Sequence, residues 1–166
     1  MAHFVIAGAS GVGKSHFSKI AENFGYKYVS VSDILREAFM IPEASSKGRL
    51  ASVVYDYITR EGETWLAPLV LEHMSVPNTC VDGLRIALTA QQIKSKKATC
   101  VIFLTDCNER DKIFDNENSA GPSAARYFAH EIQKLYMMSD TVLVNSGSFK
   151  GLSERKFFEL LENSQD

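Results

Sequence analysis

Residues 5–26 read VIAGASGVGKSHFSKIAENFGY. An apolar run of strand length leads into a glycine-rich turn with the spacing GxxxxGKS, and an amphipathic helical pattern follows the turn. Glycines at positions 8, 11 and 13 permit positive φ angles, which let successive backbone N–H groups point toward an anion. The stretch therefore predicts a phosphate-binding loop between a first strand and a first helix, whose N-terminus adds its own free N–H groups.

Two side chains of this loop suit a nucleotide and its metal ion. The Lys14 ammonium would reach the β- and γ-phosphates of ATP, and the Ser15 hydroxyl would ligate Mg²⁺. We interpret His16 as a packing or surface residue beside the nucleotide rather than as a catalytic one. ATP and Mg²⁺ are therefore the expected cofactors. The residues expected to border the nucleotide are Gly8, Ala9, Ser10, Gly11, Val12, Gly13, Lys14, Ser15 and His16.

The composition is that of a globular protein with one domain. The chain has 166 residues, of which 45% are hydrophobic and 23% are charged, and its net charge is -2. This mild acidity argues against a protein that bulk positive charge holds on DNA, but it leaves room for a local basic groove. No apolar run approaches the ~18–20 residues of a membrane span, so we expect no membrane partner.

The compartment is indicated by the start of the sequence and by the cysteines. The opening HFVIAGAS at 3–10 shows neither a basic leader nor a cleavage site, so we expect no signal peptide. The three cysteines, Cys80, Cys100 and Cys107, form no CxxC pair and lack the spacing of zinc ligands. We expect buried free thiols and a cytoplasmic location, in the cytoplasm of a host cell if the protein is viral.

Short apolar runs alternate with helical patterns along the chain. The runs are rich in Val, Ile, Phe and Tyr and read as strands that are buried on both faces. Such alternation predicts an α/β fold in which helices cover both faces of a parallel sheet. The predicted strands span 3–7, 26–31, 79–82, 99–105 and 141–145, and the predicted helices span 14–24, 50–59, 65–74, 124–138 and 152–161.

Two segments between these elements stand out. Residues 34–74 form a long helical insert between the second and third strands, which is either plain scaffold or a flap over a substrate. Residues 115–123, DNENSAGPS, are the most polar and turn-rich, and read as a loop before a helix that Pro122 helps to start. No repeat or linker divides the chain, so we expect a single domain over residues 1–166.

The segment VSVSDILREAF at 29–39 resembles the start of the monophosphate-binding helix in nucleoside monophosphate kinases such as adenylate kinase. The resemblance assigns Asp33 and Arg36 to the acceptor, with the arginine on the acceptor phosphate, a role that its planar fork suits. From the residues alone, Ser32 is expected to cap this helix. The alternative interpretation is that Ser32 and Asp33 are simply capping residues and that Arg36 is a solvated surface charge.

The segment TCVDGLR at 79–85 resembles the Asp-Gly…Arg segment of the same kinases and of the dephospho-coenzyme A kinase type. Asp82 would then face the Mg²⁺ beside Ser15, since open α/β sheets bind ligands at the carboxyl ends of their strands. Arg85 would bind the acceptor or the moving phosphoryl group. The alternative is an Asp-Gly turn with an exposed arginine. Further on, Gln91 or Gln92 offers an amide to read a base.

Two later segments extend the resemblance. VIFLTDCNERDKIF at 101–114 is similar to the strand that leads into the lid of these kinases, which implies that Arg110 and Arg126 clamp donor phosphates. The lid, at about 108–126, is short and has just two arginines. DTVLVNSGSFKGL at 140–152 is similar to the last strand and adenine loop, which makes Asn145 and Gly147 candidate neighbours of the donor base.

The resemblance spans nearly the whole chain and implies a three-layer P-loop kinase fold with a five-stranded parallel sheet, a helical acceptor-binding insert at about 34–74 and a short lid. It implies transfer of the ATP γ-phosphoryl group to a small-molecule acceptor, a nucleoside or deoxynucleoside monophosphate, in the positive field of Lys14, Mg²⁺, Arg85, Arg110 and Arg126. One alternative is a kinase of this fold that acts on a hydroxyl, such as hydroxymethyluracil in viral DNA, with Asp33 as general base. Another is a P-loop module that binds nucleotide as a switch.

Overall fold

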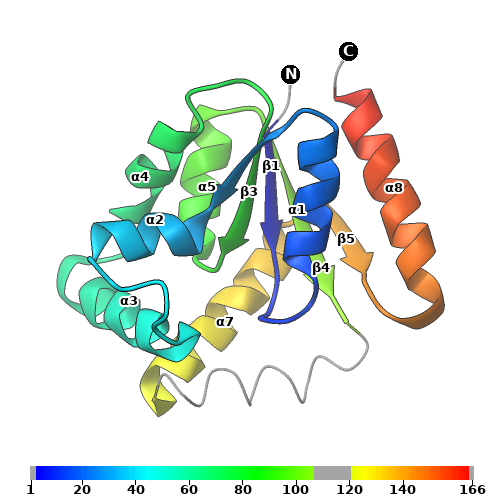
Figure 1. Ribbon diagram of the computed structural model, residues 1–166. Helices are drawn as coiled ribbons and strands as arrows, with labels where there is room; N and C mark the ends of the chain where they lie inside the picture. The colour runs from blue at the N-terminus through cyan, green and yellow to red at the C-terminus, as the bar shows by residue number, and fades with distance from the viewer. Residues whose placement is uncertain (1–2, 107–120, 165–166) are drawn as a thin grey trace.

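A computed structural model describes residues 3–106 and 121–164 of the chain. Within these residues five parallel strands form one sheet in the order β2-β3-β1-β4-β5 (Figure 1). Each predicted strand is present, and its ends lie within two residues of the predicted ones, which confirms the α/β fold. The strands are β1 (His3–Ala7), β2 (Lys27–Ser30), β3 (Thr79–Leu84), β4 (Thr99–Thr105) and β5 (Thr141–Val144).

Helices fill the connections between the strands, and α2 to α4 make up the helical insert between β2 and β3. Pro122 stands in the first turn of α7, as predicted. The apolar pattern did not predict α5, because its buried side is made of small residues such as Ala87 and Ala90. The helices are α1 (Lys14–Asn23), α2 (Val31–Ala38), α3 (Lys47–Glu61), α4 (Leu66–His73), α5 (Ala87–Lys96), α7 (Pro122–Met138) and α8 (Lys150–Asn163), with a 3-10 turn η2 (Gly147–Phe149).

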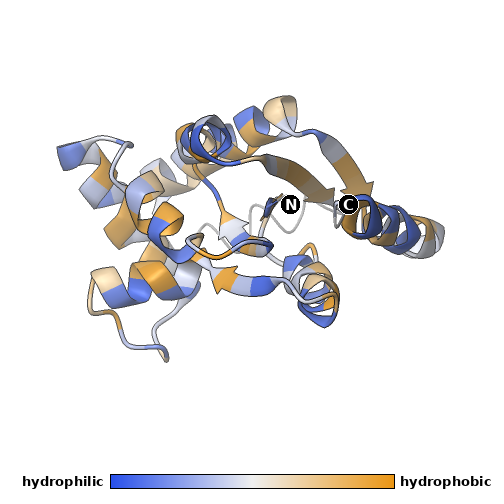
Figure 2. Cartoon of the chain, turned by 90° about the horizontal axis from the view of Figure 1, so that it is seen from above, coloured by the Kyte–Doolittle hydropathy of each residue, from blue (hydrophilic) through white to orange (hydrophobic). Residues whose placement is uncertain are grey.

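Helices cover both faces of the sheet. Phe103 of β4 pairs with Ala7 of β1, so these two side chains lie on the same face of the sheet. Side chains alternate along a strand, and Phe4 is three positions before Ala7, so Phe4 and Phe103 lie on opposite faces. The Phe4 ring meets Phe157 of α8 at a centroid distance of 6.0 Å, and the Phe103 ring meets Tyr136 of α7 at 5.4 Å. Because α1 packs with α8 and α5 packs with α7, the three layers are helix, sheet and helix. Figure 2 shows hydrophilic and hydrophobic residues together on these helices, as expected of helices with one buried side.

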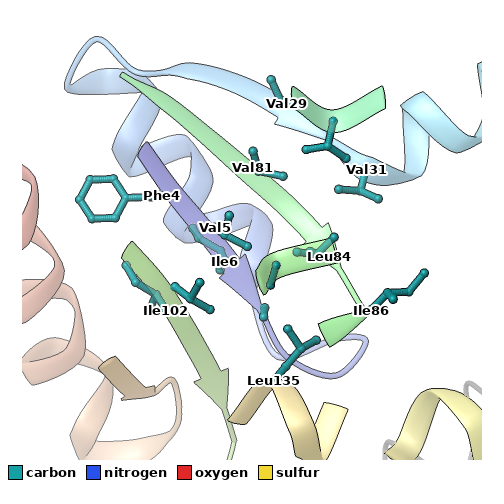
Figure 3. Close-up of a cluster of buried hydrophobic side chains, with 14 of the residues drawn as sticks. Phe4, Val5, Ile6, Val29, Val31, Val81, Leu84, Ile86, Ile102 and Leu135 are labelled. Carbon is teal, nitrogen blue, oxygen red and sulfur yellow. The ribbon is translucent and has the colours of Figure 1, made fainter. Parts of the chain in front are cut away.

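The core is centred on β1, which lies between β3 and β4 and is buried along its whole length. Figure 3 shows side chains of β1, β3 and β4 meeting those of β2 and the surrounding helices. Cys80 of β3 is a buried free thiol, and burial raises its pKa to about 12, as expected for a cysteine that serves packing. The core side chains labelled in Figure 3 are Phe4, Val5, Ile6, Val29, Val31, Val81, Leu84, Ile86, Ile102 and Leu135.

Helix α2 begins two residues earlier than the sequence suggested. Its N-cap is Ser30, the last residue of β2, whose Oγ accepts a hydrogen bond from the Asp33 N–H at 3.2 Å. The prediction that Ser32 caps this helix was therefore wrong. The strand leads into the helix without a connecting loop because Val31, the first helical residue, is drawn into the core at 2% exposure.

We expect Phe157→Ala to lower the free energy of unfolding by about 3–5 kcal/mol, because its ring is buried between Phe4 and Phe17 and its loss leaves a cavity. The adjacent Phe158 is 37% exposed and gives the matched control, for which we expect a clearly smaller loss. Urea unfolding of both variants measures the difference. Equal losses would mean that α8 does not pack as described.

Candidate active site

The connection from β1 to α1 is built from glycines that other residues cannot replace. Gly8, Gly11 and Gly13 have φ angles of 135°, 84° and 94°, which side chains rarely tolerate. A Cβ on Gly8 would also lie 2.3 Å from the Leu104 carbonyl oxygen, and a Cβ on Gly13 would lie 2.1 Å from Nδ2 of Asn145. The loop thus has the backbone conformation that the GxxxxGKS spacing predicted.

Asn145 follows edge strand β5 and holds this loop in place. Its side-chain Nδ2 donates to the Val12 carbonyl at 2.8 Å, and its backbone N–H donates to the Thr105 carbonyl at 2.8 Å. The sequence suggested that Asn145 and Gly147 frame a donor base. The structure adds a contact that was not predicted, since the Asn145 side chain supports the phosphate-binding loop itself. Gly147 is exposed in η2.

Lys14 and Ser15 begin α1 at the end of the loop. The Lys14 Nζ donates to the carbonyls of Gly8 at 3.1 Å and Ala9 at 2.5 Å, so the ammonium lies across the loop. The Ser15 Oγ donates to Oδ2 of Asp82 at 3.3 Å. A cation, a hydroxyl and a helix N-terminus are thereby gathered where a phosphate chain would bind.

A β-bulge brings Asp82 to this loop. Ile6 of β1 pairs with Asp82, but Ala7 pairs with Leu84, so Gly83 is an extra residue in β3. Gly83 has a φ of 86°, and bulges of this kind re-aim neighbouring side chains beside active sites. The Asp-Gly pair is therefore part of the strand rather than the turn that was the alternative interpretation.

The Asp82 carboxylate is buried, with 7% of the residue exposed. Its Oδ2 accepts from Ser15 and, at 3.3 Å, from the hydroxyl of Tyr28. Burial raises the pKa of Asp82 above its ordinary value of 3.8, and the nearby Lys14 and Lys47 oppose that rise. Burial and the Asp82 charge together raise the pKa of Tyr28 to about 12, so the phenol stays protonated and donates.

The Ser15 hydroxyl and the Asp82 carboxylate fit a magnesium ion. Mg²⁺ prefers oxygen ligands and usually binds through one or two protein groups together with phosphate oxygens and water. The Asp82 Oδ1 is buried and has no hydrogen-bond partner among the described residues, so this oxygen can coordinate a metal ion. In residues 3–106 and 121–164 no cluster of three or more His, Cys, Asp or Glu side chains offers a rival metal site.

A cavity of about 390 Å³ adjoins the loop and reaches toward α2, α3, α4 and α7. Three cationic side chains line it, Lys14, Lys47 and Arg85, whereas Asp82 is its only acidic residue in the described part of the chain. The remainder of the wall combines aliphatic side chains with serines, glycines and two aromatic rings. The other lining residues are Ser10, Gly11, Gly13, Ser15, Tyr28, Ser30, Val31, Ser32, Leu35, Leu50, Ala51, Val54, Leu66, Gly83, Ile86 and Phe128.

Two residues predicted for the acceptor lie elsewhere. Asp33 is exposed on α2, and Arg36 donates to the carbonyls of Pro42 at 2.8 Å and Ser45 at 2.9 Å. Both border a second, shallow hollow instead of the cavity beside the loop. Arg36 thus holds the segment that joins α2 to α3, and the structure does not bring it together with Arg85.

The remaining predicted residues are dispersed. The His16 ring contacts Oε1 of Glu154 at 2.7 Å on the surface, which agrees with its interpretation as a surface residue. Gln91 and Gln92 lie on α5 and Arg126 is exposed on α7, and none of the three lines the cavity. Arg110 and the greater part of the predicted lid lie outside the described residues.

Most of the cavity wall was not predicted from the sequence, and three of its residues show why. Lys47 had a usable signal, since a lysine at the first position of a helix opposes the helix dipole. Tyr28 lies on edge strand β2 and reaches Asp82 only because β2 pairs with β3 in register. Phe128 had no signal in the sequence, because only the packing of α7 brings it to the cavity.

No family model and no curated protein matches the sequence. Solved structures match along its whole length. Shikimate kinase from Aquifex aeolicus covers 99% of this chain and 98% of its own, with a TM-score of 0.59 and 13% identity. Shikimate kinase from Acinetobacter baumannii in complex with shikimate covers 99% and 95%, with 0.60 and 12%. A gluconokinase from Sinorhizobium meliloti 1021 covers 99% and 95%, with 0.58 and 15%.

The chain has the P-loop kinase fold. In this P-loop kinase fold the glycine-rich loop follows the central strand, and the cavity lies at the carboxyl edge of the sheet, as in other open α/β proteins. None of the helices in the described ranges is long and apolar enough to cross a membrane. The narrower resemblance to nucleoside monophosphate kinases stays a prediction.

We expect Asp82→Asn to raise the Mg²⁺ concentration at which ATP binding is half-maximal by roughly ten- to a hundredfold, because the change removes a charged ligand. Calorimetric titration of ATP at increasing Mg²⁺ measures the effect, and Asp56→Asn, at an exposed position of α3, is the control. Since folding raises the Asp82 pKa, its ionised form lowers stability at neutral pH, and the metal-free variant should be at least as stable as the parent protein. An unchanged Mg²⁺ titration would contradict the metal role.

Proposed function

We propose that the protein transfers the γ-phosphoryl group of ATP to the phosphate of a nucleoside or deoxynucleoside monophosphate. The P-loop kinase fold and the loop with Lys14 and Ser15 support a triphosphate donor. Mg²⁺ held by Ser15 and Asp82 would neutralise charge on the phosphates during transfer. The cavity that opens from the loop supports a second, small ligand, since its volume lies in the range of small-molecule sites.

The observation that carries this proposal is the imbalance of charge in the cavity. A hydroxyl acceptor needs a general base, whereas a phosphate acceptor is already ionised. Within the described residues Asp82 is the single carboxylate on the cavity wall, and it contacts Ser15, its expected partner on the metal. Asp33, the candidate base for a hydroxyl, is exposed on α2. The cavity thus offers cations for a second anion and no separate base.

The two other functions that the sequence left open fit the cavity less well. A nucleotide switch needs no cavity that extends beyond the loop to Lys47 and Arg85. A kinase acting on a hydroxyl in DNA would need a base that the described cavity wall lacks. Both are distinguishable from the proposed reaction by what becomes phosphorylated.

A screen with labelled ATP tests the proposal. The acceptors are nucleoside monophosphates, nucleosides, dephospho-coenzyme A, shikimate, gluconate, and plain and hydroxymethylated DNA. We expect label in a nucleoside diphosphate. Label in a sugar acid, in a nucleoside or in DNA would overturn the acceptor assignment, and slow loss of ATP without a labelled acceptor would favour a switch.

Lys14→Ala should lower the rate of transfer by at least ~10²-fold, since it removes a principal electrostatic stabiliser of the moving phosphoryl group. The fold should persist, because the Lys14 ammonium bonds to loop carbonyls and lies outside the core. Steady-state turnover measures the loss, with Lys19→Ala at an exposed position of the same helix as the control. Near-normal turnover of Lys14→Ala would remove the loop from the mechanism.

Arg85→Ala should raise the acceptor KM roughly ten- to a hundredfold with less change in the KM for ATP, because charge-assisted hydrogen bonds contribute about 1.5–3 kcal/mol. Asp33→Asn should have a smaller effect, since a phosphate acceptor requires no proton removal. Both variants are compared at two salt concentrations. A dominant Asp33 effect with a steep salt dependence would instead indicate a DNA hydroxyl acceptor.

A further inference from the structure

Lys47 stands where a lysine is unfavourable for the helix that carries it. It is the first residue of α3, after the N-cap Ser46, whose Oγ accepts from the Arg49 N–H at 3.2 Å. The first turn of α3 has no acidic residue, so the helix N-terminus and the Lys47 ammonium add their positive potentials. Such an arrangement is expected where an anion binds, because a bound anion offsets the repulsion.

The cavity brings this charge together with Arg85 and Lys14. Lys47 lines the same cavity as Asp82, so its ammonium faces the interior of the site. In the proposed reaction Lys14 is engaged by the phosphates of ATP. Lys47 and Arg85 are the other two cations on the described cavity wall, so an acceptor phosphate in this cavity would lie beside them.

Apolar side chains line part of the cavity beside these cations, and two aromatic rings, Tyr28 and Phe128, line it as well. Leu35, Leu50, Val54, Leu66 and Phe128 come from four different helices and converge on the same space. In the part of the chain that is described, no Asn or Gln side chain lines the cavity, so hydrogen-bonding side chains other than the charged groups are hydroxyls. A hydroxyl of a polyhydroxylated acceptor that faced this apolar part of the wall would be left unpaired, whereas a planar ring would fill it.

We infer that Lys47, together with Arg85, binds the phosphate of the acceptor, and that the acceptor base packs against Phe128 and the aliphatic wall and is selected by shape. This inference rests on the proposed function and deepens it by naming the residues and the mode of base selection. It assigns the acceptor phosphate to Lys47 of α3 in place of Arg36 of α2, because Arg36 holds the connection between these two helices.

Binding of unreacted ligands tests the inference without turnover. Calorimetry compares each monophosphate with its nucleoside: AMP with adenosine, CMP with cytidine, GMP with guanosine and dTMP with thymidine. We expect Lys47→Met to weaken monophosphate binding about tenfold or more and to leave nucleoside and ATP binding within about twofold. Lys47→Arg should restore binding. Arg49→Met is the matched control, because Arg49 is exposed in the same first turn and does not line the cavity.

The outcomes separate this inference from the proposed function. If ATP binds and a monophosphate is phosphorylated, but Lys47→Met binds that monophosphate like the parent protein, the Lys47 role is wrong and the proposed function stands. A monophosphate whose binding responds to Lys14→Ala and not to Lys47→Met occupies the donor site and also overturns the inference. Failure of all four monophosphates to bind overturns it as well. A preference above about a hundredfold among the four bases would contradict selection by shape.

We expect Lys47→Met to fold like the parent protein. The Lys47 side chain is exposed, and the change removes a cation from a helix N-terminus, so the urea midpoint should equal or exceed that of the parent protein. A gain in stability combined with a loss of monophosphate binding is the result expected of a residue retained for binding.

Discussion

Parallel pairing of β1 with β3 on one side and with β4 on the other is the constraint on which the site depends. Because parallel strands end at the same edge of a sheet, the pairing of Ile6 with Asp82 fixes the carboxylate beside the turn that follows β1. Gly83 then adds one residue to β3, which lets the strand continue to Leu84 while Asp82 reaches Ser15. The pairing of β4 adds the Leu104 carbonyl, against which only a glycine fits at position 8.

The electrostatics of the site follow from this geometry. Asp82 is forced into a buried position, and its charge is compensated by donors and cations that arrive from other elements: Ser15 from α1, Tyr28 from β2 and Lys47 from α3. Burial alone would favour a protonated carboxyl, and a cation-rich surrounding favours the ionised form that a metal ion needs. The fold therefore places a buried acid where a bound metal ion would offset its unfavourable desolvation.

Much of the fold could be predicted from the sequence, because strands buried on both faces are continuous apolar runs and the GxxxxGKS spacing has a defined backbone geometry. Helix α5 was not predicted because small residues such as Ala87 and Ala90 make up much of its buried side. The start of α2 was predicted wrongly because a serine at position 30 or 32 is a suitable N-cap. Burial of Val31 as the first helical residue favours Ser30. The cavity wall was harder to predict. Leu50 and Phe128 reach the cavity only through the packing of α3 and α7. The resemblance that assigned Arg36 to the acceptor carries no sign of its bonds to the carbonyls of Pro42 and Ser45.

The bond from Asn145 to the Val12 carbonyl links the last strand to the first turn, across 133 positions of the chain. During synthesis the whole GxxxxGKS segment leaves the ribosome early, yet the support beneath it is not made until β5 has emerged. A nascent chain that ends before Asn145 therefore has the nucleotide-binding sequence without the fastened loop. Nucleotide should stabilise the finished protein far more than any shorter nascent chain, so that ligand binding acts as a late, selective step in folding.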